Sequence, residues 1–283
     1  MDFLDLFPGL QPWVKSLSEG GLITLFQQAE WLFSVVESFH LLALATLGGC
    51  VLVLNLRLMG VGMTSESPAL IEKNLRPYLW VAIVVLIVTG LLMGTVVAQR
   101  LYSRPAFFIK MLSLAAALFL SLGVVGSVAR NGGLITQPAK IMAGVALAIW
   151  LFAISIFATT YGPAPGTQHI VYAAWLITMA FGSKSTRIIL GAISAVWIVA
   201  HFLATFIIWN PSDDYDLVME IDRWSLRCFA LTVTGFMLWE FAGPKSDQSV
   251  SPKLTRLIGL LTILVWVTVA ASGRWIGLGG GDG

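Results

Sequence analysis

The sequence predicts an all-α integral membrane protein, a polytopic helical bundle of about eight transmembrane helices, with seven as the alternative. Of its 283 residues, 57 % are apolar and 11 % are charged, whereas a soluble domain carries about 25 % charged residues. Mean hydropathy is +0.85, and several apolar runs reach about 20 residues, enough to cross a hydrocarbon core of roughly 30 Å. This composition excludes a soluble enzyme and a nucleic-acid partner, and it makes membrane lipid the surroundings of the chain.

Residues 1–30 predict an amphipathic N-terminal segment. Asp2 and Asp5 alternate with apolar positions, and Trp13 and Phe26 follow. Such a pattern is typical of one or two short helices that lie on the membrane surface. A loosely ordered terminus is the alternative.

The apolar runs that follow predict helices at about 31–57, 77–98, 106–129, 139–160, 186–209, 224–242 and 254–273. The run 169–183 spans only about 22 Å as a helix, so it is either a thin span or a re-entrant segment. It decides between eight spans and seven. Prolines at 77, 105, 138 and 252 stand at the starts of runs, where a missing N–H leaves no helical hydrogen bond unmade.

The breaker cluster at 161–166 (YGPAPG) divides the chain into two halves. We therefore expect a first four-helix membrane unit over 31–160 and a second membrane unit over 161–276. Residues 277–283, rich in glycine, predict a flexible tail.

The loop cations predict the orientation. In the eight-span arrangement one side collects ten of them: Arg57, Lys73, Arg76, Arg130, Lys140, Lys184, Arg187, Lys245, Lys253 and Arg256. The other side collects six: Lys15, Arg100, Arg104, Arg223, Arg227 and Arg274. Because cytoplasmic loops are enriched in Lys and Arg, the first side is expected to be cytoplasmic and both termini periplasmic.

Ionisable residues inside membrane helices are costly and are functional candidates by default. His40 and His201 lie at similar predicted depths, roughly 12–14 Å below the outer surface. Two imidazoles at one depth on different helices are what a bis-histidine b-type haem requires, and Gly90 offers a small surface for a flat macrocycle. The haem b cofactor is therefore a hypothesis with His40 and His201 as metal ligands. For each histidine, the alternative is an interhelical hydrogen bond.

Three charged residues accompany these histidines near the outer face. Lys110 is a candidate counter-charge for haem propionates or a quinone oxygen, and Arg274 for the same role; a side chain that snorkels to the interface is the alternative. Glu37 lies three residues before His40 and so shares its helix face. It is a candidate proton acceptor from a quinol, or a group that orients a neighbour.

Two further features bear on partners. The outer loop 210–222 holds five acidic residues and could steer a basic partner such as a periplasmic c-type cytochrome; a solvated loop is the alternative. The two cysteines, Cys50 and Cys228, lie in separate apolar runs without metal-ligand spacing, so they predict neither a disulfide nor a zinc site.

Several short strings together resemble a family of uncharacterised bacterial polytopic membrane proteins. They are ESFHLLA at 37–43, LNLRLMG at 54–60, RPYLW at 76–80, PAFFIK at 105–110 and SGRWIG at 272–277. The chain departs from the family's pattern at Asn55, where the pattern has Asp, and at Val124–Val125, where members often carry a histidine. A more distant resemblance reaches the copper-resistance D family and b561-type cytochromes. The resemblance implies an all-helical protein of the bacterial inner membrane.

Three functions follow as hypotheses. The first is a membrane electron-transfer subunit that binds b-type haem between helices and links the quinone pool to an outer-face partner. The second is a permease for a small solute or copper, since Met59, Met63, Met93 and Met111 offer thioether ligands for Cu(I). The third is a non-catalytic anchor or assembly subunit of a larger membrane complex. The sequence leaves open whether the protein is an enzyme.

Overall fold

A computed structural model describes residues 8–102, 104–156, 168–208, 215–242 and 252–278. These residues form helices and short connections, without a strand among them. Within these described ranges, six helices are long and apolar enough to cross a membrane, which confirms an all-α polytopic membrane protein. The helix α10 is apolar but shorter, and α12 lies outside the six, so the count of eight spans stays a prediction.

The order of elements is simple. The N-terminal part contains η1 (Pro8–Leu10), α2 (Gln11–Ser18) and α3 (Gly21–Gln28). The main bundle contains α4 (Glu30–Met59), α5 (Pro68–Val96), α6 (Ala98–Tyr102), α7 (Pro105–Leu118), the π-helical segment η2 (Phe119–Val125), α8 (Gly126–Arg130), α9 (Gln137–Ile156) and α13 (Lys253–Leu278). Between α9 and α13 in sequence come α10 (Gln168–Phe181), α11 (Lys184–Ile208) and α12 (Tyr215–Ala242).

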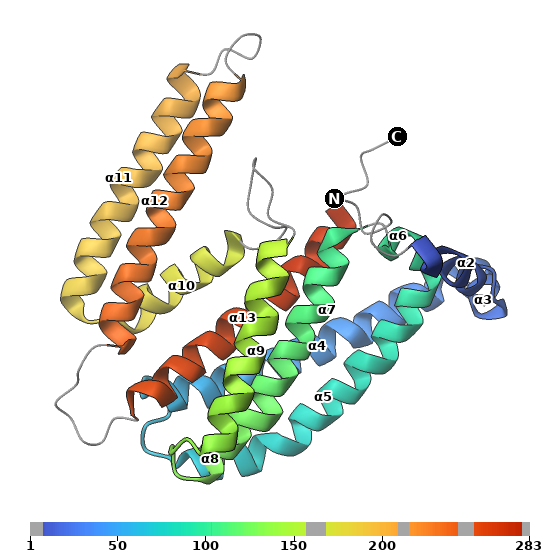
Figure 1. The fold of residues 1–283 in the computed structure, drawn as a ribbon, viewed down its shortest axis with the longest axis horizontal. Coiled ribbons are helices and arrows are strands. Elements are labelled where there is room, and N and C mark those ends of the chain that lie inside the picture. Colours follow the sequence, from blue (N-terminus) through green and yellow to red (C-terminus); the bar gives the residue numbers. More distant parts are fainter. Residues whose placement is uncertain (1–7, 103, 157–167, 209–214, 243–251, 279–283) are drawn as a thin grey trace.

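The last helix, α13, lies at the centre of the main bundle (Figure 1). In its most apolar stretch 72 % of the residues are buried inside the protein, against 17–44 % for the other five candidate spans. It packs against α4 and α7, while Trp150 of α9 donates a hydrogen bond to Thr268 at 3.0 Å and Trp266 donates one to Ser121 of η2 at 2.8 Å. Lipid tails are as apolar as the helices, so the hydrophobic effect does not drive the helices to associate. Interhelical hydrogen bonds of this kind help to hold them together.

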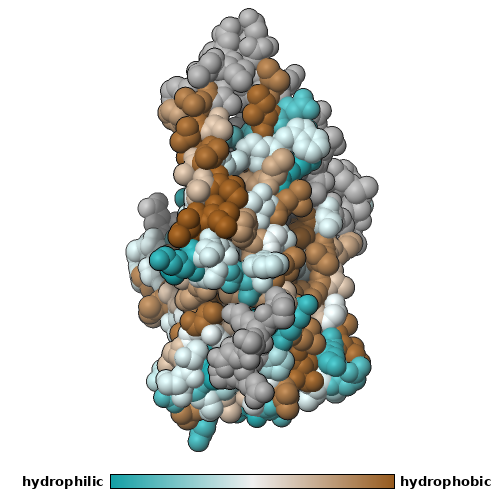
Figure 2. Space-filling view, turned by 90° about the vertical axis from the view of Figure 1, so that its left-hand side faces the viewer, coloured by the Kyte–Doolittle hydropathy of each residue, from teal (hydrophilic) through white to brown (hydrophobic). Residues whose placement is uncertain are grey.

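The helices α11 and α12 lie side by side and stand apart from α4 and α5 (Figure 1). They connect to the main bundle through α10 and the end of α12, which contact α13. Figure 2, which faces the side where α11 lies, shows apolar side chains gathered in its upper half. Val196, Val199 and Phe202 are among the exposed apolar residues of α11, as expected of a helix that faces lipid.

Two helices begin earlier than the apolar runs predict. The second span starts at Pro68 and not at 77, so Pro77 lies inside α5. Ser67 caps this helix, with its hydroxyl accepting from the backbone N–H of Leu70 at 3.2 Å, and Pro68 takes the first position, where proline is favoured. The prediction that Pro77 begins the helix was therefore wrong, because the first turns of α5 are polar.

The acidic stretch 210–222 was likewise predicted as a loop, but α12 already begins at Tyr215. Two short N-terminal helices, α2 and α3, do occur where the amphipathic segment predicts them. The breaker cluster 161–166 lies outside the described residues. So does most of the glycine-rich tail, of which α13 includes residues 277 and 278.

Gly259 marks a close approach of α13 to α4. A Cβ atom built there would lie 2.9 Å from the backbone oxygen of Asn55 and 3.2 Å from Cγ of Met59. Small residues let transmembrane helices approach in this way. We therefore expect Gly259→Ala to force the helices apart and to lower the free energy of unfolding by about 1–3 kcal/mol.

Thermal unfolding in detergent, followed by the helical circular dichroism signal, tests this expectation. Gly49→Ala on α4 is the matched control, because nothing lies within 4 Å of its Cβ position. Equal midpoints for the Gly259 and Gly49 variants would show that the crossing is not tight.

Candidate functional site

His40 is held by a hydrogen bond that fixes which ring nitrogen carries the proton. Its Nδ1 lies 2.8 Å from Oγ1 of Thr89 on the neighbouring helix α5. The same Oγ1 lies 2.6 Å from the carbonyl oxygen of Val85, and because a carbonyl cannot donate, the single hydroxyl proton of Thr89 goes there. Thr89 must therefore accept from Nδ1–H of His40, which leaves a lone pair on Nε2 when the ring is neutral.

Gly90 lies against the edge of the same ring. The Cβ position at Gly90 is 3.5 Å from Cε1 of His40, an ordinary contact distance. A methyl group fits there, but a longer side chain would push the imidazole away from Thr89. Gly90 thus lies next to His40, and its role as a small surface beside a bound group stays a prediction.

Lys110 approaches the same region from α7. Its charge acts on the imidazole of His40, and its side chain runs past Gly273 of α13, with Nζ 3.4 Å from the Cβ position there. Among the described residues, no carboxylate lies within ion-pair distance of its ammonium. The group therefore has capacity to stabilise an added oxygen or negative charge.

Four helices contribute to this site: α4, α5, α7 and α13. We call His40, Thr89, Gly90, Lys110 and Gly273 the His40 site. Glu37 is exposed, one turn before His40 on the same helix, and Arg274 is exposed and adjacent to Gly273. Both flank the His40 site rather than line it.

His201 lies elsewhere. It belongs to α11, where its ring stacks on Trp197 at 5.5 Å between centroids, with Nε2 3.3 Å from Oδ1 of Asp222 and Nδ1 3.4 Å from Oγ of Ser225. These partners are on α11 and α12, which stand apart from α4 (Figure 1). The structure does not bring the rings of His40 and His201 together.

The structure therefore does not pair His40 with His201 as the two ligands of one haem, and haem b itself stays a prediction. The chain has three histidines, and the third, His169, is exposed on α10 beside Tyr172. His40 can offer Nε2 as one ligand, but no second imidazole faces it. Within the described ranges no group of three His, Cys, Asp or Glu residues could hold a metal ion either.

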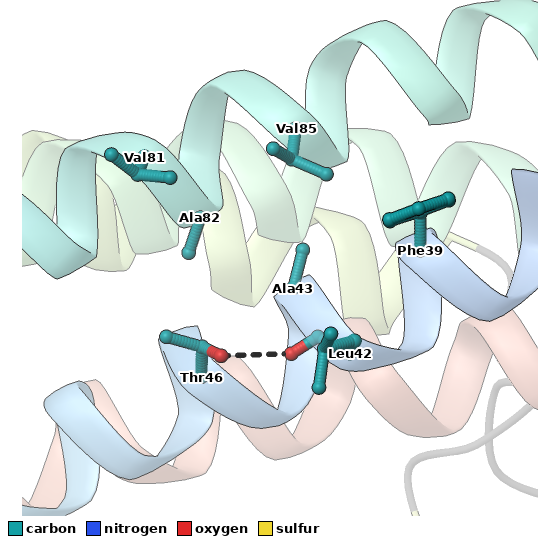
Figure 3. A pocket seen from close by; sticks show the side chains of 7 residues that line it. All are labelled: Phe39, Leu42, Ala43, Thr46, Val81, Ala82 and Val85. Atoms are coloured by element: carbon teal, nitrogen blue, oxygen red, sulfur yellow. Dashed lines mark hydrogen bonds between the residues drawn. The ribbon is translucent and has the colours of Figure 1, made fainter.

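An apolar groove of about 150 Å³ runs between α4 and α5 next to the His40 site. Figure 3 shows its lining, with Ala43 and Ala82 at the floor and Phe39 at one end. Phe39 directly precedes His40 and Ala43 follows it by about one turn of α4, and the carbonyl oxygen of Val85, another lining residue, accepts a hydrogen bond from the hydroxyl of Thr89. Ala43 and Ala82 are buried whereas Phe39 is 58 % exposed, so the groove opens outward from a buried floor.

The four methionines proposed for Cu(I) do not form one set. Met59 and Met63 lie at the end of α4 and just after it, while Met93 and Met111 lie near the opposite end of the bundle. Met59 is fully buried in the core and Met63 is 53 % exposed. The four side chains therefore lie in two groups at opposite ends of the bundle.

Sequence reasoning missed three parts of the His40 site: Thr89, Gly273 and the groove. Thr89 stands directly before Gly90 in an apolar run, and a buried hydroxyl there is a weak signal, because threonine commonly bonds to its own helix. Its contact with His40 becomes visible only when α5 is placed against α4.

The comparisons with known proteins agree with an uncharacterised family. Residues 27–162 match the model of a family of unknown function, DUF6644. This part contains α4 to α9, and therefore His40, Gly90 and Lys110, but not His201 or α13. No curated protein and no solved structure matches the chain.

The proton assignment of His40 can be measured directly. We expect ¹⁵N-histidine spectra at alkaline pH to show Nδ1–H for the resonance that His40→Gln removes. Thr89→Val takes away the acceptor and should shift that resonance toward the Nε2–H form. Thr95→Val on the same helix is the control, since among the described residues the Thr95 hydroxyl bonds only to the carbonyl oxygen of Leu92 in its own helix. An unchanged spectrum for the Thr89 variant would contradict the assignment.

Proposed function

We propose that this protein is a membrane electron-transfer subunit that binds a quinol or quinone at the His40 site. The observation that carries the proposal is that one region of the bundle holds both the imidazole of His40, with a lone pair on Nε2, and the ammonium of Lys110, which has no carboxylate partner among the described residues. A base and a cation together suit a hydroxyl that must lose a proton. The sequence places this end of the bundle at the outer face.

The proposed reaction needs a group that takes a proton from the quinol and a positive charge beside the quinol oxygen. The hydroxyl of a quinol donates to Nε2 of His40, which takes its proton as a general base. The ammonium of Lys110 stabilises the negative charge that develops on the quinol oxygen. Glu37, exposed one turn away, is the group through which the proton passes on to solvent. Oxidation to the quinone releases two protons and two electrons: the second hydroxyl gives its proton to water, and the electrons pass one at a time to two molecules of an outer-face acceptor of the c-type cytochrome class, which are reduced.

The groove between α4 and α5 supports a substrate with an apolar tail. It is lined by apolar side chains from residue 39 to 46 and from 81 to 85. Because α4 and α5 are antiparallel, the groove extends from the level of His40 and Thr89 toward the middle of the bundle. A polar head at the His40 site would therefore place an attached isoprenoid chain along the groove and in the lipid.

Haem takes no part in this proposal. The described residues supply one imidazole at the His40 site, so no electron step is routed through haem. Haem b, a copper or small-solute permease, and an assembly subunit stay predictions of the sequence, and each is a possible outcome of the following measurements.

The first measurement is quinol binding by the purified protein in detergent, followed by quenching of its tryptophan fluorescence. Replacing His40 by Gln, or Lys110 by Met, removes a hydrogen bond that involves a charged or developing ionic group. Such bonds contribute about 1.5–3 kcal/mol, so we expect about tenfold to hundredfold weaker binding.

His201→Gln is the matched control, because it changes a histidine that lies on α11, away from the site, and should leave binding unchanged. Equal affinity of the His40, Lys110 and wild-type proteins would overturn the proposal. A reduced-minus-oxidised spectrum with a haem α-band that both histidine variants abolish would support the sequence-predicted haem instead.

The groove gives a second prediction. Ala82→Leu fills its floor, so binding of a long-tailed quinone should weaken about tenfold or more, while binding of the tail-less head group stays the same. Ala45→Leu, at an exposed position of α4, adds the same volume outside the groove and is the control. Equal losses for tailed and tail-less quinones would remove the groove from the proposal.

A further inference from the structure

A second charged cluster lies at the opposite end of the bundle, around Glu72 of α5. Its carboxylate is buried, with 7 % of the side chain exposed. Arg76 donates to it through Nε at 2.9 Å and Nη2 at 2.5 Å, and Arg130, the last residue of α8, donates through Nη1 at 2.8 Å. We call these three residues the Glu72 cluster.

The Glu72 cluster carries an excess of positive charge. One carboxylate faces two guanidinium groups, and Lys73 is exposed beside it. The side chains of Arg76 and Arg130 are 45 % and 49 % exposed. Each guanidinium has five N–H donors, and among the described residues the bonds to Glu72 use two from Arg76 and one from Arg130.

Glu72 also fixes where the guanidinium groups lie. A buried carboxylate that accepts three hydrogen bonds orients both arginines toward one place, and Gly126 makes room for the contact. Its Cβ position is 3.2 Å from Nη1 of Arg130 and 3.5 Å from Oε1 of Glu72. The arrangement is therefore a preformed pair of guanidinium groups with donors left over.

The expected depth of the Glu72 cluster in the membrane indicates what kind of ligand it binds. The apolar run of α5 begins only at residue 77, so Glu72 and Arg76 lie where lipid head groups are expected. Exposed side chains of α5 turn apolar just beyond Arg76, at Tyr78, Trp80 and Val81. A lipid there would meet guanidinium donors at its phosphate and apolar side chains along its acyl chains.

We propose that Arg76 and Arg130 bind the phosphate of an anionic phospholipid in the leaflet at this end of the bundle. Guanidinium groups recognise phosphate through paired, charge-assisted hydrogen bonds, and basic clusters between transmembrane helices bind anionic head groups. Glu72 is a positioning residue that holds both arginines. The sequence predicts this end to be cytoplasmic, where anionic lipid is available.

The test compares lipids that differ only in the head group. The midpoint of thermal unfolding is measured for delipidated protein with added phosphatidylglycerol or phosphatidylcholine of the same acyl chains. We expect phosphatidylglycerol to raise the midpoint more, because a ligand of the folded state stabilises it. In Arg76→Gln/Arg130→Gln this difference should vanish, with at least about tenfold weaker lipid binding.

Two controls separate a lipid site from a merely structural ion cluster. Lys140→Gln removes an exposed cation at the start of α9 and should keep the phosphatidylglycerol effect. Glu72→Gln keeps both guanidinium charges but removes the carboxylate that orients them, so it should reduce the phosphatidylglycerol effect without abolishing it. An effect that survives in the double arginine variant, or is lost in Lys140→Gln, would overturn the proposal.

Two further measurements distinguish a bound lipid from free phosphate and compare the two lipids directly. If inorganic phosphate alone reproduces the whole shift, the ligand is free phosphate and the lipid assignment is wrong. Native mass spectrometry of the wild-type protein supplied with both lipids gives an answer that does not depend on the variants folding. Preferential retention of phosphatidylglycerol supports the site, and equal retention of the two lipids contradicts it.

Discussion

The close packing of α13 into the other helices is the constraint on which the site depends. At Gly259 an added Cβ atom would lie 2.9 Å from the backbone oxygen of Asn55, so α13 and α4 cross closely there, and fourteen residues later Gly273 lies against Lys110. Because a helix rises about 1.5 Å per residue, these two contacts are about 21 Å apart along the axis of α13. A shift of α13 at Gly259 would thus be carried to the level of Lys110 and His40.

The chemistry of His40 is set by a residue that itself takes part in no reaction. The hydroxyl of Thr89 donates its hydrogen bond to the carbonyl oxygen of Val85 and accepts one from His40, so the helix α5 determines the tautomer of a ring on α4. Partners of this kind orient functional histidines in many sites. The same contact places the ring edge against Gly90, which explains why two adjacent residues of α5 matter to one side chain of α4.

Much of the fold could be predicted from the sequence, because about 20 consecutive apolar residues have few options in lipid except a spanning helix. The starts of α5 and α12 could not be found this way, since their first turns are polar and lie before the apolar run begins. Ser67 followed by Pro68 was the available signal for α5. In the His40 site, His40 and Lys110 could be picked out because an ionisable group in a membrane helix is costly, and Gly90 because glycine leaves space. Thr89 and Gly273 could not, because their roles depend on which helices are in contact.

The placement of His201 shows the limit of reasoning from depth. Depth in the membrane follows from counting residues along a helix, but it fixes only one coordinate of a side chain. Which helices are neighbours, and which way each is rotated, depends on packing between segments far apart in sequence, as with α13 and α4. His201 has a full set of partners on α11 and α12 in Trp197, Asp222 and Ser225. A histidine satisfied in that way needs no iron to account for its presence in an apolar helix.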